Sequence, residues 1–253
     1  MTASTKKSEP EFSFSLNRNS LKYIAAVAML LDHIGMVFSS FFMQTTWGVV
    51  LYSVLRVIGR LTAPIMCFFL VQGFLHTHSK KTYTLRLAIF AVVSQIPYAL
   101  AHKNSFLTLD FNMLFTLLIS FAMLCVWETR PETVPKTIVL LILVCASAFC
   151  DWGLFAPLLV LFFYVFRENR QKLIFSYCIL VLFVCLMSCI FLASHGMHWY
   201  GELWQLGLFL FIPVLFIYNG EPGSRAAFHK WFFYVFYPLH LLLLWGIASS
   251  LRA

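Results

Sequence analysis

Long apolar runs separated by short polar gaps occupy the chain from residue 21 to residue 250. A helix that crosses a bilayer needs about 20 apolar residues, because each residue rises ~1.5 Å and the hydrocarbon layer is ~30 Å thick. This length predicts an all-α, polytopic bundle of about nine transmembrane helices. The approximate bounds of the nine segments are 21–42, 49–75, 83–101, 112–127, 136–150, 153–166, 173–193, 203–218 and 231–250.

The fifth and sixth runs are shorter than a full crossing. Asp151, Trp152 and Gly153 between them are typical of a tight hairpin. Eight or ten spans therefore stay open as alternatives. The polar stretch 1–20 predicts a disordered cytoplasmic tail, and 21–253 predicts a single transmembrane domain, because the gaps are too short to hold a soluble module. The first run is too long for a signal-peptide core, so we expect it to be retained.

The basic residues predict the orientation of the chain, since Lys and Arg collect in cytoplasmic loops. With nine spans and a cytoplasmic N-terminus, 14 of the 18 Lys and Arg residues face the cytoplasm. The exceptions are Lys103 and Arg252 on the opposite side, and Arg56 and Arg60 within the second span. This asymmetry favours an odd number of spans.

The composition agrees with a lipid environment. Hydrophobic residues make up 61% of the chain and charged residues only 11%, whereas a soluble domain has roughly 25% charged residues. The net charge of +8 suits the anionic lipid of an inner leaflet, so we expect membrane lipid as a partner and no nucleic acid. The seven cysteines lie in or beside apolar runs and are interpreted as free thiols.

Asp32 and His33 lie about midway along the first predicted span. A carboxylate near the centre of a bilayer costs at least ~2.5–3.5 kcal/mol, so an ionisable residue there is a functional-site hypothesis by default. Arg56 and Arg60 share one face of the second span, because they are four residues apart. One of these arginines is the expected partner of Asp32. A purely structural ion pair between the two helices is the open alternative.

Other polar side chains fall in the middle or the expected outer half of the bundle, and this clustering by depth predicts a polar cavity between the helices. Bonds to neighbouring backbone, and a helix cap for Asn112, are the simpler alternatives. The remaining histidines and the tryptophans near span ends are interpreted as interfacial residues, with no chemistry and no metal site assigned. The polar residues expected at the cavity are Gln95, Asn112, Asp151, Gln205 and His240.

The ordered set of short motifs resembles the TraX family, over nearly the whole chain. That family takes its name from a conjugative-plasmid protein required for N-terminal acetylation of pilin. A mid-membrane His in the first helix also resembles the wider group of multi-pass membrane acyltransferases. The matching motifs are LK at 21–22, DH at 32–33, IGRLTAP at 58–64, GFLHT at 73–77, SQIP at 94–97, NMLFT at 112–116, DWG at 151–153, YNG at 218–220 and FYPLHL at 236–241.

The resemblance implies acetyl transfer from cytoplasmic acetyl-CoA, a reaction that needs a base, an oxyanion donor and a dry cavity. His33 is the expected general base, and Asp32 would orient it or hold Arg60. Arg60 or Arg56 would stabilise the oxyanion or hold a coenzyme phosphate, and His240 is a second acid/base candidate. A covalent acetyl-His intermediate stays open. The expected substrate-binding or coenzyme-binding residues are Arg56, Gln95, Asn112, Asp151 and Tyr237.

The chain is therefore expected to be an acetyltransferase of a bacterial inner membrane, acting on a pilin N-terminus or an envelope glycan. One alternative is a proton-coupled transporter with Asp32, His33 and His240 as a relay. Against it, no second Asp-His run occurs in a corresponding half of the chain, as a repeated transporter fold would have. A non-enzymatic pilus-assembly protein is the other alternative.

Overall fold

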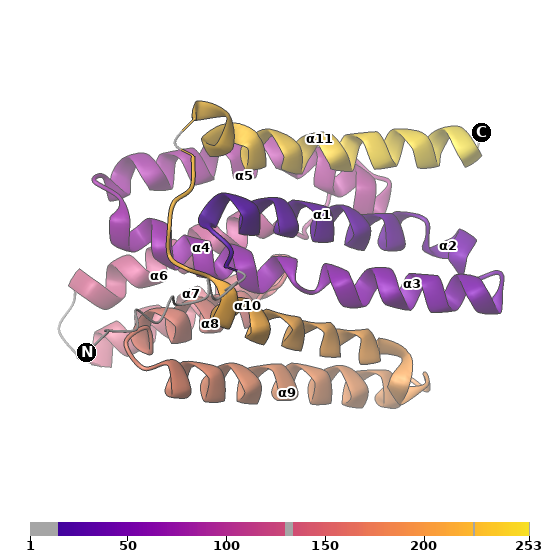
Figure 1. Ribbon diagram of the computed structural model, residues 1–253. Helices are drawn as coiled ribbons and strands as arrows, with labels where there is room; N and C mark the ends of the chain where they lie inside the picture. The colour runs from indigo at the N-terminus through magenta and orange to yellow at the C-terminus, as the bar shows by residue number, and fades with distance from the viewer. Residues whose placement is uncertain (1–14, 130–133, 225, 253) are drawn as a thin grey trace, which may run out of the picture.

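The computed structural model describes residues 15–129, 134–224 and 226–252, and these are helical almost throughout (Figure 1). Extended pairing within them is limited to two isolated bridges, Leu16 with Tyr218 and Phe111 with Cys150. The α-helices are α1 Arg18–Val37, α2 Ser39–Phe42, α3 Thr46–Gly59, α4 Thr62–His76, α5 Lys80–Lys103, α6 Met113–Thr129, α7 Val134–Ala146, α8 Phe155–Val165, α9 Arg170–Ser194, α10 Phe211–Ile217 and α11 Ala227–Arg252. Two 3₁₀ helices, η1 Ser147–Phe149 and η2 Trp199–Leu210, complete the set.

Six helical segments of the described chain are long and apolar enough to cross a membrane. They are Arg18–Val37, Thr46–His76, Lys80–Lys103, Arg170–Ser194, Trp199–Ile217 and Trp231–Leu251. Three shorter apolar helices cover Met113–Glu128, Val134–Phe149 and Phe155–Val165. Each predicted apolar run thus coincides with a helical segment, and the all-helical membrane class is confirmed. Nine full crossings and a cytoplasmic N-terminus stay predictions.

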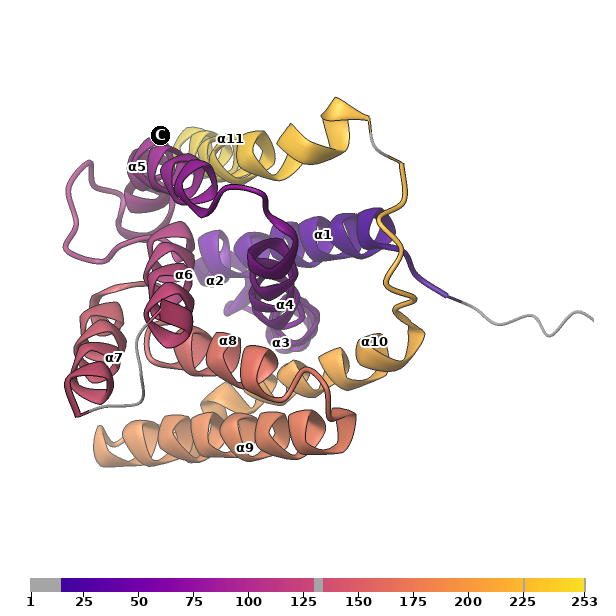
Figure 2. The same ribbon diagram turned by 90° about the vertical axis from the view of Figure 1, so that its left-hand side faces the viewer.

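The start of α1 lies toward one end of the bundle and the end of α11 at the other (Figure 1). Helix α1 packs against α3, α4 and α11, while α5 packs against α6 and α11. Helix α9 lies on the far side of α8 and η2 (Figure 2). The core of the bundle therefore surrounds α1, which is the helix that contains Asp32 and His33.

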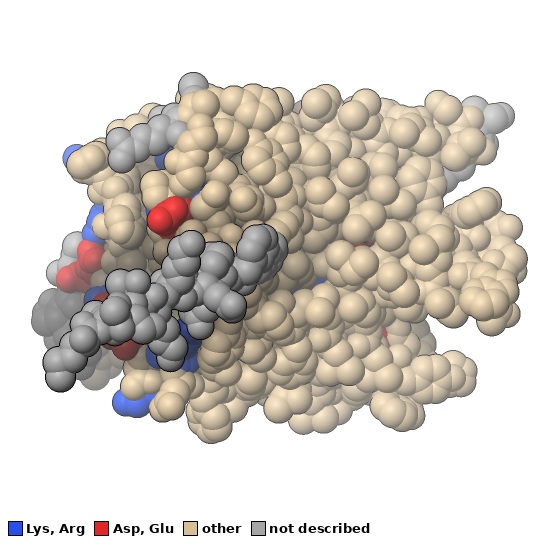
Figure 3. All heavy atoms as spheres, in the orientation of Figure 1, with Lys and Arg blue, Asp and Glu red and all other residues tan. Residues whose placement is uncertain are grey.

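Charged side chains gather at the end of the bundle where α1 begins, and the other half of the same face is almost bare of them (Figure 3). We call the charged end the basic end. The gathering of charged side chains at one end agrees with the predicted asymmetry of Lys and Arg between the two sides of the membrane.

The described chain begins inside the predicted tail of residues 1–20. Residues 1–14 lie outside the described residues, but Leu16 pairs with Tyr218 and α1 begins at Arg18. The side chain of Asn17 accepts a hydrogen bond from the Ser20 amide at 3.0 Å, which satisfies one of the unpaired amides at the helix start. This cap explains why the helix begins three residues before the predicted apolar run.

The second span is broken between α3 and α4, beside Asp32. Helix α3 ends at Gly59 and α4 begins at Thr62, with Pro64 unable to donate the backbone hydrogen bond of a continuous helix. A Cβ atom on Gly59 would lie 2.3 Å from both Cβ and Oδ1 of Asp32. Only glycine therefore allows α3 to approach α1 this closely.

Replacement of Gly59 by alanine should separate the two helices. We expect Gly59→Ala to lower the unfolding free energy by about 1–3 kcal/mol, as overpacking of a tight contact does. Gly246→Ala is the matched control, because a Cβ at that helical glycine meets no atom within 4 Å. Thermal unfolding in detergent measures both variants, and equal stability of the two would contradict the close-approach explanation.

Candidate active site

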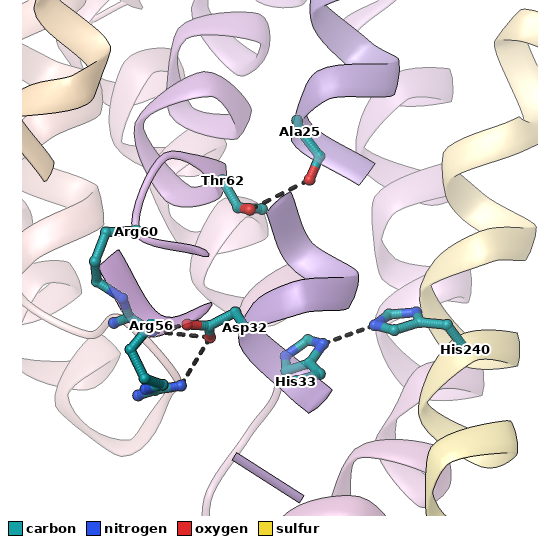
Figure 4. A network of polar contacts seen from close by, with 7 residues as sticks. All are labelled: Ala25, Asp32, His33, Arg56, Arg60, Thr62 and His240. Carbon is teal, nitrogen blue, oxygen red and sulfur yellow. Dashed lines mark hydrogen bonds and ion pairs between the residues drawn. The ribbon is translucent and has the colours of Figure 1, made fainter. Parts of the chain in front are cut away.

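A single carboxylate joins α1 to α3 in the interior of the bundle. The Asp32 carboxylate accepts hydrogen bonds from Arg56 Nη1 at 2.9 Å and from Arg60 Nη2 at 2.7 and 2.8 Å (Figure 4). All three side chains are largely buried, with exposed fractions of 13%, 13% and 7% for Asp32, Arg56 and Arg60. The predicted pairing is therefore present, and both arginines take part. One amino group of each guanidinium is left for another acceptor.

Two tryptophans cover the arginines. The Arg60 guanidinium lies 4.5 Å from the centre of the Trp152 ring and 4.6 Å from that of Trp204. The Arg56 guanidinium lies 4.3 Å from the Trp204 ring centre. These contacts correct the interpretation of Trp152 and Trp204 as interfacial anchors. Aromatic faces attract a cation and exclude water from it, which strengthens the ion pair beneath.

His33 projects from α1 toward α11 and meets His240 there (Figure 4). His33 Nδ1 lies 2.7 Å from His240 Nε2, and His240 Nδ1 lies 2.7 Å from the carbonyl oxygen of Phe236. A carbonyl only accepts, so His240 Nδ1 must donate, and its Nε2 must accept from His33 Nδ1. When both rings are neutral, this chain of bonds leaves a lone pair on His33 Nε2, the atom that a general base needs.

His102 is a member of this cluster that the sequence reasoning missed. Its ring stands edge-on to His33 with 5.7 Å between ring centres, and its Nδ1 lies 3.1 Å from the Tyr98 carbonyl. Its place at the end of the predicted span 83–101 indicates an interfacial residue. The signal that the sequence does hold is its spacing of one helical turn after Tyr98.

The arginines and His33 line one cavity of about 500 Å³, within the size range of small-molecule sites. Asp32, His102 and Asp151 also line it, together with the Gln205 side chain. The Gln205 Oε1 atom is buried and has no partner among the described residues. Residues of α9, including Leu180, Phe183 and Met187, form an apolar wall. The cavity therefore combines a base, cations and a largely apolar boundary.

Asp151 balances the charges of this cavity. Two aspartates and two arginines line it, so their formal charges cancel when all four are ionised. Asp151 forms no ion pair with either arginine among the described residues. Its backbone is fixed, because its amide donates to the Phe111 carbonyl at 2.7 Å and its carbonyl accepts from Thr116 Oγ1 at 2.5 Å.

Gln95 and Asn112 are not brought to this cavity. Asn112 Nδ2 donates to Gln95 Oε1 and to the Ala91 carbonyl, both at 2.8 Å. Asn112 Oδ1 accepts from the Leu114 amide at 3.0 Å, and Gln95 Nε2 donates to the Asp110 carbonyl at 2.9 Å. These bonds join α5 to the start of α6, so the simpler alternative of backbone bonds and a helix cap describes both residues.

Tyr237 does not line the 500 Å³ cavity but lies close to His33. It is buried and lines a small cavity of about 30 Å³ that also touches Asp32, His33 and Met66. Among the described residues no group of three or more His, Cys, Asp or Glu could hold a metal ion.

The fold and this site define a polytopic helical membrane protein with a buried histidine and arginine cavity. The chain belongs to the TraX protein family, whose sequence profile matches residues 17–248. A relative from Dichelobacter nodosus, named "Probable fimbrial assembly protein FimC, serogroup H1", is 32% identical over 243 residues, which cover 92% of this chain and 96% of the relative. No solved structure matches the chain significantly.

Loss of the Asp32 charge should destabilise the protein strongly. Asp32→Asn removes the carboxylate to which both buried guanidinium groups bond, and we expect a loss of about 3–5 kcal/mol in the unfolding free energy. The matched control is Asp110→Asn, since Asp110 forms an exposed pair with Lys103 at 2.9 Å, whose loss costs about 1 kcal/mol or less. Denaturant unfolding in detergent separates the two, and similar losses would contradict a buried ion pair at Asp32.

Proposed function

We propose that this protein is an acetyltransferase of the bacterial inner membrane. It moves an acetyl group from cytoplasmic acetyl-CoA to an amine or hydroxyl, on a pilin N-terminus or an envelope glycan. The observation that supports this most is the hydrogen-bond chain from the Phe236 carbonyl through His240 to His33. The chain leaves His33 Nε2 as a base in the same cavity as two arginines.

His33 acts on the proton of the acceptor. As the acceptor nitrogen or oxygen forms a bond to the acetyl carbonyl carbon, His33 Nε2 takes its proton and becomes an imidazolium, which still donates through Nδ1 to His240. The carbon–sulfur bond then breaks, and the leaving thiolate takes the proton from His33 Nε2. The products are an acetylated acceptor and a free thiol, and both histidines return to their starting state.

Arg56 and Arg60 stabilise the negative charge that develops on the carbonyl oxygen. Each has an amino group that Asp32 does not use, and the aromatic cover from Trp152 and Trp204 excludes water from them. Preorganised donors in such surroundings stabilise an oxyanion far more than they would in water. Asp32 holds both arginines in position, and this is the role we assign to it.

The acceptor occupies the part of the 500 Å³ cavity between α8, α9 and the ion pair. Gln205 Oε1 is available to accept a hydrogen bond from an amine or hydroxyl. A pilus-related acceptor is supported by the family to which the chain belongs and by the printed name of its relative as a fimbrial assembly protein.

That printed name also favours a second function, a non-enzymatic role in pilus assembly. In this case the cavity would bind a subunit without reacting with it. The protein would then assemble pili without consuming acetyl-CoA, and substitution of His33 would leave pili intact.

Purified protein tests the acetyltransferase directly, with radiolabelled acetyl-CoA as donor and membranes of a deletion strain as acceptor. We expect His33→Ala to reduce acetyl transfer about a hundred- to ten-thousand-fold, the usual contribution of a general base. His240→Ala should cause a smaller loss, because it removes only the group that fixes the His33 tautomer. His240→Gln should recover part of that loss, since its amide oxygen can accept from His33 Nδ1.

His198→Ala is the matched control, because His198 is an exposed histidine before η2. Transfer by this variant should equal that of the unmodified protein. Unchanged transfer by His33→Ala would show that His33 is not the base. Absence of transfer by the unmodified protein, together with normal pilus formation by His33→Ala in cells, would support the assembly role instead.

A further inference from the structure

A second large cavity opens at the basic end of the bundle, where the chain preceding α11 crosses the start of α1 (Figure 1). Its volume is about 390 Å³. Three cationic side chains line it, Arg18 and Lys22 from α1 and Arg86 from α5, and no Asp or Glu does. We call this cavity the vestibule.

No carboxylate pairs with the three cations in the part of the chain that the structure describes. None of the ion pairs among the described residues involves Arg18, Lys22 or Arg86. The Arg18 Nε atom is buried and has no hydrogen-bond partner there. Arg86 Nε donates to the Tyr234 hydroxyl at 3.0 Å, and Lys22 Nζ makes only a long contact of 3.5 Å with the His229 carbonyl. Three like charges around one cavity repel each other, so an anion bound there would be strongly favoured.

The vestibule continues inward as a narrow apolar passage of about 110 Å³. Lys22, Phe69 and Tyr83 line both spaces. Met66 and Tyr237 line the inner end of the passage and also the small cavity that touches His33. Asp32 and His33 in turn line both that small cavity and the 500 Å³ cavity. The four spaces therefore follow one another from the basic end to the active site.

One face of α1 runs along this whole series. Lys22, Ala25, Met29 and His33 line successive spaces, and their spacing of three or four residues places them on one side of a helix. From Lys22 to His33 the rise is about 16 Å, roughly the length of five extended residues. A ligand held at both ends must therefore have a charged head and a long, thin arm.

We infer that the vestibule binds the phosphate groups of a nucleotide-linked acyl donor, whose arm lies in the passage with its acyl group at His33. This inference rests on the proposed function for the identity of the donor. Arginine and lysine pair with phosphate through charge-assisted hydrogen bonds, and the rings of Phe69, Tyr83 and His229 lie beside them. The vestibule volume is within the range of ligand sites, about 300–1,000 Å³.

A phospholipid head group has the same phosphate chemistry, and the shape of the passage favours the nucleotide donor. A phospholipid has two acyl chains, whereas the passage has room for one thin arm. Helices α1, α4, α5, α6 and α11 line the passage with apolar side chains, among them Ala25, Leu70, Leu87, Leu114 and Phe233.

Binding measurements on the full-length protein in lipid nanodiscs test the site without relying on catalysis. The probes are coenzyme A, which has head and arm, and adenosine 3′,5′-bisphosphate, which represents the head alone. We expect Arg18→Gln, Lys22→Gln and Arg86→Gln each to raise the Kd of both probes about tenfold or more, because each removes a charge-assisted contact. Lys172→Gln, an equal change of charge at an exposed position at the start of α9, should leave both Kd values unchanged.

A variant with a filled passage distinguishes binding of the arm from binding of the head. Ala25→Phe fills the passage, so it should abolish coenzyme A binding or weaken it to the level of the bisphosphate, while bisphosphate binding persists. Retained bisphosphate binding also shows that this variant is folded. If Ala25→Phe yields no folded protein, Leu117→Trp blocks the passage from α6 and replaces it. Full coenzyme A binding in a folded, blocked variant would overturn the route.

The outcomes distinguish this inference from the proposed function. Acetyl transfer by the unmodified protein, with Kd values unaffected by the three Gln variants, would overturn the vestibule and leave the function standing. Coenzyme A binding that depends on the three cations, without any acetyl transfer, would contradict the function and leave the vestibule standing. A lipid site would be shown instead if neither probe bound in phosphatidylcholine nanodiscs, while native mass spectrometry detected phosphatidylglycerol retained by the unmodified protein and lost in Arg86→Gln.

Discussion

The structure depends on keeping one carboxylate charged in the interior of a membrane protein. Asp32 lies between Arg56 and Arg60, and each neighbouring feature serves that arrangement. Gly59 lets α3 approach α1, the break before α4 places both arginines at the end of α3, and Trp152 and Trp204 cover the guanidinium groups. A buried ion pair of this kind gives little net stability, but loss of one partner is costly. Its main effect is therefore to fix where α1, α3, η2 and the chain before α8 meet.

Helix α1 also carries His33, the residue next to Asp32, on a different face. Neighbouring residues on an α-helix are turned by about 100°, so Asp32 faces α3 while His33 faces α11. His33 is therefore free of the ion pair and bonds to His240, whose own tautomer is fixed by a backbone carbonyl. The central cavity brings the two sides of α1 together around one space. The imidazole comes from α1 and the guanidinium groups come from the end of α3. They meet in one cavity because α1 packs against both α3 and α11.

Sequence reasoning located the centre of the site because polar residues are conspicuous in apolar helices. Depth along the membrane was sufficient to predict that Asp32 pairs with the arginines and that His33 and His240 are neighbours. The direction in which each side chain points around its helix was not predictable from depth alone. Gln95 on α5 and Asn112 just before α6 bond to each other and to backbone. His102 and Trp204, by contrast, are assigned to the interface from the sequence, but they line the site or cover its arginines. From the sequence, Arg18 and Arg86 are orientation signals only and Lys22 is also part of a motif, whereas the fold places all three around one cavity.

Mass spectrometry of cell envelopes tests the central claim that His33 acts in acetyl transfer. Envelope proteins and glycans would be compared between a deletion strain, the same strain with the unmodified gene restored, and the strain with His33→Ala restored at equal membrane abundance. An acetyl group adds about 42 Da and removes a positive charge when it falls on an amine. We predict a mark of this mass with the unmodified protein and its absence in the other two strains. The same mark in the His33→Ala strain, or its absence from all three, would contradict the account.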